Sequence, residues 1–73
     1  MTLAHTSTVL DSLAWLNRAS AEFLDTLMKF RAEVVREDGV RMEATRALAH
    51  ELMDEVFDAA AATAAGLNEM EMH

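Results

Sequence analysis

Cysteine and proline are absent from this 73-residue sequence, tyrosine is also absent, and only two glycines occur. Without cysteine, no disulfide can stabilise a chain whose small size limits how much surface its one domain, residues 1–73, can bury. The three histidines, His5, His50 and His73, are scattered and form no obvious zinc site. Self-association is the remaining common way to bury more apolar surface.

The composition predicts an all-α protein. Apolar residues make up 52% of the chain, too many for a disordered protein, and the abundant Ala, Leu, Met and Glu favour helices over strands. No apolar run reaches the ~18 residues of a membrane span, and residues 1–5 lack signal-peptide features, so we expect a cytoplasmic protein with no membrane partner. The net charge of −7 makes nucleic-acid binding unlikely, because such binding depends on Lys and Arg. A local patch of Lys29, Arg31 and Arg36 is the alternative.

The first predicted helix covers about residues 8–37. Thr8 is a candidate N-cap, with Asp11 in position to complete a capping box. Apolar residues then recur at alternating steps of four and three, with one break at Ser20. These positions are Val9, Leu13, Leu16, Ser20, Phe23, Leu27, Phe30 and Val34. A second partly apolar row lies beside them, so the apolar arc is wider than one facing helix can cover.

A turn at Asp38-Gly39 is predicted to separate this helix from a second one covering about residues 40–68. Gly39 suits the left-handed backbone conformation that often ends a helix. The alternative is one continuous helix through Gly39, but that register would put Glu37, Arg41, Glu51 and Glu55 in the apolar row. A restart at Met42 instead gives Thr45, Ala49, Leu52, Val56, Ala59, Thr63, Gly66 and Met70.

Folding about the turn predicts an antiparallel helical hairpin in which residue i lies opposite a residue near 77 minus i. Large side chains then oppose small ones, as Phe57 opposes Ala19–Ala21, which favours close packing. Segments 1–6 and 69–73 are expected to fray. Because the apolar arc is wide, we expect two hairpins to form a four-helix bundle homodimer, with an obligate helical heterocomplex as the alternative. The expected dimer or hairpin core comprises Leu13, Leu16, Phe23, Leu27, Phe30, Val34, Leu52, Val56 and Phe57.

No catalytic, cofactor or metal site is predicted. The segment His50-Glu-Leu-Met-Asp54 resembles the zinc motif H-E-x-x-H with its second histidine replaced by aspartate, so it lacks ligands for tetrahedral zinc. Neither a phosphate-binding glycine loop nor an assembled nucleophile is recognisable. We therefore expect a protein that is not an enzyme.

Trp15 is the strongest candidate for contact with a protein partner, because tryptophan is enriched in binding hot spots. It is predicted to point away from the hairpin core, beside Arg18 and Glu22, unless a chain terminus covers it. These residues favour a small adaptor or chaperone-like protein. The acidic residues Glu51, Asp54 and Asp58 support an alternative, an acidic decoy or inhibitor that blocks a nucleic-acid-binding protein, although such residues are more often a solvated surface.

Overall fold

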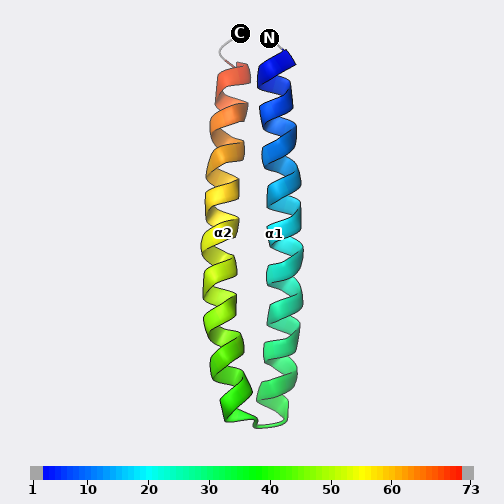
Figure 1. Cartoon of the computed structure of the whole chain (residues 1–73), viewed down its shortest axis with the longest axis vertical. Helices are drawn as coiled ribbons and strands as arrows, with labels where there is room; N and C mark the ends of the chain where they lie inside the picture. The colour runs from blue at the N-terminus through cyan, green and yellow to red at the C-terminus, as the bar shows by residue number, and fades with distance from the viewer. Residues whose placement is uncertain (1–2, 72–73) are drawn as a thin grey trace.

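Two long helices joined by a tight turn make up the structure, a computed structural model that describes the backbone of residues 3–71 and the side chains of residues 7–70. Helix α1 spans Leu3–Val35 and helix α2 spans Gly39–Glu71. They lie side by side and antiparallel in a rod 53 Å long and 13 Å across at its Cα atoms (Figure 1). The predicted all-α hairpin is therefore confirmed, and one continuous helix is excluded. Within residues 3–71, neither helix is apolar enough over a sufficient length to cross a membrane.

Both helices are longer at the open end of the hairpin than predicted. Helix α1 begins at Leu3, so Thr8 lies inside it and is not its N-cap; that prediction was wrong. Leu3 and Ala4 are good helix formers, which is consistent with the earlier start. Helix α2 continues to Glu71, so residues 3–6 and 69–71 are helical rather than outside the helices. The remaining residues of the predicted frayed ends lie outside the described part of the chain.

The turn reverses the chain through a left-handed residue at Glu37, not at Gly39. The amide of Asp38 donates to the carbonyl of Glu33 at 3.0 Å, and the amide of Glu37 donates to the carbonyl of Val34 at 3.1 Å. This pair of bonds is the Schellman motif, whose left-handed residue is Glu37 with φ of 58°. Gly39 has no positive φ, so its predicted conformation was wrong. Helix α1 ends two residues before the predicted end, which moves the left-handed position to Glu37.

Asp38 starts helix α2. Its side-chain Oδ1 accepts a hydrogen bond from the amide of Arg41 at 3.2 Å, and its carbonyl accepts one from the amide of Met42 at 2.9 Å. An N-cap aspartate satisfies an amide that has no partner within the helix. Its carboxylate also lies 3.4 Å from Arg41 Nε. The sharp reversal thus depends on consecutive capping residues, Glu37 and Asp38.

We call the rows of residues through which the two helices face each other the seam. On α2 the seam follows the predicted register, since every predicted position is buried or half-buried. Those positions are Thr45, Ala49, Leu52, Val56, Ala59, Thr63, Gly66 and Met70. Val9 of α1 lies against Gly66, where the predicted register placed Asn68. The pairing is thus shifted by two residues from the prediction.

On α1 the seam uses a different row from the one predicted. Leu16, Phe23 and Phe30 are half-buried there, as predicted. The residues that alternate with them along the seam, however, have smaller or more polar side chains than the predicted ones. They are Ser12, Ala19, Thr26 and Glu33 instead of Leu13, Ser20, Leu27 and Val34. Small residues let the helix axes approach closely, as Ala19 and Ala59, only 2% and 0% exposed, demonstrate. The large residues Leu13, Leu27 and Val34 are left outside the seam.

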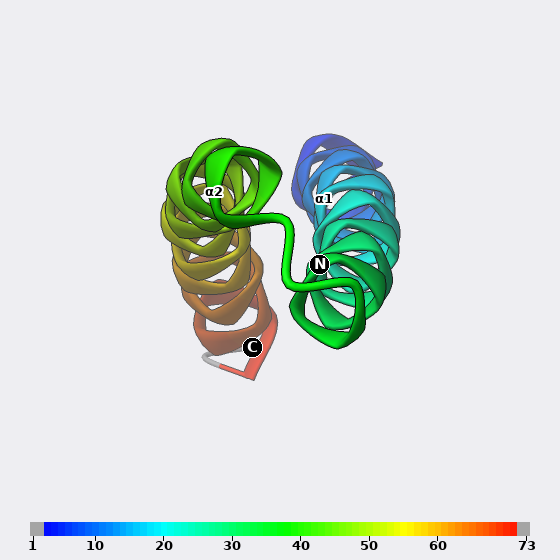
Figure 2. The same ribbon diagram turned by 90° about the horizontal axis from the view of Figure 1, so that it is seen from below.

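Polar seam residues are largely satisfied within their own helices. Thr26 donates to the carbonyl of Glu22, and Thr63 donates to the carbonyl of Ala59, each at 2.8 Å. Such bonds to the preceding turn allow a threonine hydroxyl to be buried without a partner on the other helix. Glu33 differs, because its Oε1 is buried without a hydrogen-bond partner among the described residues. Figure 2 views the rod from its turn end, where the chain crosses from α1 to α2.

Replacing Glu37 with glycine is expected to stabilise the hairpin by about 0.5–1 kcal/mol, because glycine adopts a positive φ without the steric cost borne by other residues. Chemical denaturation of the Glu37→Gly protein would measure the change. The Glu37→Ala protein is the matched control, since it loses the same carboxylate but keeps the strained backbone. Equal stabilities of the two variants would contradict this explanation.

The two glycines are expected to respond oppositely to alanine. A Cβ at Gly66 would lie 2.8 Å from Val9 Cγ2, and the stiff valine would have to shift, whereas a Cβ at Gly39 meets nothing within 4 Å. Gly39→Ala should therefore gain up to about 1 kcal/mol of helix propensity, and Gly66→Ala should gain none or lose about 1 kcal/mol. Thermal and urea unfolding would compare them, and an equal gain at both sites would show that the seam is not tight at Gly66.

Candidate functional site

One side of the hairpin exposes a continuous set of large apolar side chains, which we call the apolar face. Helical spacing places Leu13, Leu27 and Val34 in one column beside the α1 seam, and Leu10 and Leu24 in the next column outwards. On α2 the corresponding columns carry the remaining members of this face. These members are Met53, Phe57 and Leu67, with Ala60 and Ala64 between them. Phe57 is 62% exposed and Leu24 is 59% exposed, so the single chain leaves much of this face uncovered.

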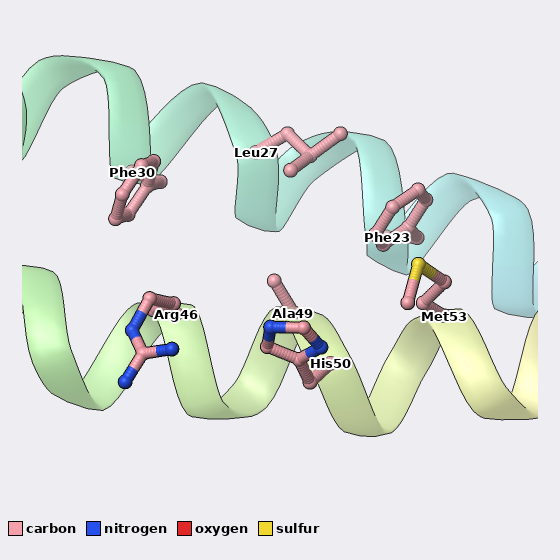
Figure 3. A pocket seen from close by; sticks show the side chains of 7 residues that line it. All are labelled: Phe23, Leu27, Phe30, Arg46, Ala49, His50 and Met53. Atoms are coloured by element: carbon pink, nitrogen blue, oxygen red, sulfur yellow. The ribbon is translucent and has the colours of Figure 1, made fainter.

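A hollow of about 200 Å³ lies on the apolar face between the two helices. Phe23, Leu27 and Phe30 line it from α1, and α2 contributes the other four lining residues (Figure 3). These four are Arg46, Ala49, His50 and Met53. The rings of Phe23 and Phe30 and the methyl group of Ala49 point across the space between the helices. The hollow exists because Ala49 is too small to fill the space between two phenylalanines.

Charged residues on the apolar face lie in its half nearer the turn. Arg46 donates a hydrogen bond to Glu43 Oε1. This bond and the attraction between the two opposite charges lower the pKa of Glu43 and raise the pKa of Arg46. A lowered carboxyl pKa stabilises the fold at neutral pH, and that contribution is lost as the pH falls through the folded-state pKa. Both groups are exposed, so the contribution is small. The pair leaves this part of the face with little net charge.

The opposite side of the seam carries the hydrogen bond between Trp15 and Glu55. Trp15 Nε1 donates to Glu55 Oε1 at 3.0 Å, and both side chains are half-buried. The prediction that Trp15 points away from the hairpin core was wrong, because the face that carries it also carries the buried residues Ser12 and Ala19. This error follows from the wrong choice of the α1 row. Because the seam passes through Ser12 and Ala19, Trp15 lies at the edge of the seam.

Most of the predicted partner-binding residues share this side, which we call the acidic face. Arg18 and Glu22 accompany Trp15 on α1, and Glu51 and Asp58 occupy the matching outer column of α2. Asp54 instead lies on the back of α2, opposite the seam. All of these residues except Trp15 are exposed. Sequence reasoning missed Glu55 as the partner of Trp15, although both belong to columns next to the seam in the register that the structure adopts.

The predicted core residues divide into two groups. Leu16, Phe23, Phe30, Leu52 and Val56 are buried or half-buried between the helices. The hairpin itself does not bury Leu13, Leu27, Val34 and Phe57, which stand on the apolar face. Phe57 is on the outer column of that face, because the seam passes through Val56 and Ala59. A second chain would be needed to bury this second group.

The zinc-like segment of α2 and the alternative basic patch of α1 are each divided between different sides of the hairpin. Among the described residues, no three His, Asp or Glu side chains gather closely enough to hold a metal ion. His50 lines the apolar hollow, whereas Glu51 belongs to the acidic face. Of the three residues in the alternative basic patch, Arg31 and Arg36 line a second hollow on α1 near the turn. Lys29 lies in the column of Trp15 and Glu22, on the other side of α1 from Arg31, so helical spacing does not bring all three residues together.

The chain matches no protein-family model, no curated protein and no solved structure. The two faces of the hairpin are therefore the features that bear on its function.

Proposed function

We propose that this chain is a small, acidic, non-enzymatic helical protein, an adaptor or chaperone-like protein of the cytoplasm that acts by protein–protein contact. The apolar face is the observation that supports it. Contiguous exposed apolar surface on a small protein marks an interaction site, and here it includes Leu10, Leu24 and Phe57 together with the hollow. The charged residues are concentrated elsewhere on the rod, so this face suits another apolar surface.

Two hairpins paired through the apolar face would form a four-helix bundle. One of the four long sides of a rod with an accessible surface of 5401 Å² offers on the order of 1,300 Å² per copy, above the ~800 Å² per partner of a standard interface. A homodimer would bury Leu13, Leu27, Val34 and Phe57, which the single hairpin leaves exposed. The same face would serve an obligate helical heterocomplex, the alternative assembly.

In the homodimer the acidic face remains outside and available to a protein partner. Trp15 is half-buried and held by Glu55, so it would offer a rigid ring edge rather than a freely projecting side chain. Arg18, Glu22 and Glu51 surround it with exposed charges. An aromatic anchor within a polar rim is a common composition for a binding site.

A second candidate function is that of an acidic decoy or inhibitor of a nucleic-acid-binding protein. Its support is the exposed acidic set of α2, Glu51, Asp54 and Asp58, on a chain of net charge −7. Such a row of carboxylates could occupy a basic groove in place of phosphates.

The purified chain is expected to have about twice the mass of the 8.1 kDa monomer by sedimentation equilibrium, because dimerisation covers the apolar face.

In affinity capture from the native cell, a folded Trp15→Ala protein should lose its partner. Val40→Ala is the matched control, since Val40 is highly exposed and lies beside the turn. A monomer at high concentration would contradict the homodimer, and unchanged capture by Trp15→Ala would contradict the adaptor site.

The decoy function predicts a strong salt dependence. Replacing Glu51, Asp54 and Asp58 with Gln or Asn should weaken partner binding at least about tenfold at low salt, because these carboxylates would attract the basic partner. Added salt should weaken binding of the unmodified protein for the same reason, since it screens this attraction. Neutralising Glu37, which is exposed at the turn, is the control. Fluorescence titration at several salt concentrations would measure both, and binding that ignores salt and charge would exclude a decoy.

A further inference from the structure

Phe57 and the hollow form a complementary pair on the same apolar face. Phe57 is a large, 62% exposed side chain, and the hollow is an apolar space between Phe23, Phe30 and Ala49 that this chain leaves unfilled. Phe57 cannot reach its own hollow from its place on the outer column of α2. It lies two helical turns, about 10 Å, along that column from His50, which lines the hollow.

From this pair we infer how two copies dock, an inference that rests on the proposed homodimer: each Phe57 inserts into the hollow of the other copy. This docking needs a two-fold axis that is perpendicular to the rod and passes at the level of Met53. Rotation about this axis places Phe57 of each copy at the level of His50 in the other copy. The two rods then run in opposite directions, with their turns at opposite ends.

The charges on the apolar face favour this orientation. Arg31, Glu43, Arg46 and His50 occupy the half nearer the turn. The half nearer the open end carries Leu10, Leu13, Phe57 and Leu67 and, among residues 7–70, no ionisable side chain in these columns. Opposed rods place the charged half of one copy on the uncharged half of the other. The two Arg46 side chains then stand roughly 20 Å apart, beyond the ~8 Å screening length. Rods with their turns together would instead place the two charged halves against each other.

The first test compares Phe57→Ala with Leu48→Ala, two exposed apolar residues of α2 on opposite faces. Sedimentation equilibrium of the full chain should show the dimer Kd rising at least about tenfold for Phe57→Ala, because a side chain filling a pocket is a typical hot spot. Leu48→Ala should change it less than about twofold. Phe57 lies outside the seam, so circular dichroism should show both hairpins folded. Equal effects of the two variants would overturn the inference.

The second test keeps Phe57 and measures the orientation. Because the sequence has no cysteine, a spin label on Asn68→Cys, at an exposed position near the open end, reports a single distance between copies. Opposed rods predict a label separation on the order of 45 Å, and rods with their turns together predict roughly 20–30 Å. The shorter distance in a dimer would overturn the inference while leaving the four-helix bundle intact. A chain that stays monomeric would overturn both, and the hollow would then serve a partner of different sequence.

Discussion

The close approach of two helices through small side chains is the constraint on which the rest of this structure depends. Val9 against Gly66, and the fully buried Ala59, define a seam with little room for large residues. Helix spacing is set by the side chains at the contact, so alanine, serine, threonine and glycine allow close contact and bury little apolar area. Leu13 and Leu27 of α1 consequently stand beside the seam instead of within it.

This constraint makes the two sides of the hairpin unequal. On one side Trp15 closes the edge of the seam through its bond to Glu55, and charged residues cover the surface beyond. On the other side Leu27 and Met53 border the hollow, and no comparable hydrogen bond between the helices is described there among residues 7–70. One side is therefore completed by polar contacts within the chain, while the other exposes apolar groups that the chain cannot cover by itself.

Periodicity was enough to predict the helices, the hairpin and the α2 seam, because α2 has a single row of small and apolar residues from Thr45 to Met70. It failed on α1, which has two adjacent rows compatible with the same period. Hydrophobicity favoured the row of Leu13 and Leu27, but the narrow seam selected Ser12 and Ala19. The prediction of the turn failed for a similar reason. The preference of glycine for a left-handed conformation is local, whereas the position of the left-handed residue depends on where α1 ends, and that position is Glu37. The position of Trp15 could not be predicted until the α1 row was known.

A seam this thin also links folding to association. Its buried hydroxyls bond within their own helices, so Thr26 and Thr63 add little attraction between the helices, and the fully buried apolar residues are small. A short chain with such a core has little stability to spare, and any partner that binds the folded hairpin through Leu24, Leu27 and Phe57 stabilises it by mass action. The apolar row that was displaced from the seam thus supplies the surface whose burial can offset the weakness of the seam. In the proposed dimer, burial of the apolar face would both select the partner and add stability that the seam does not provide.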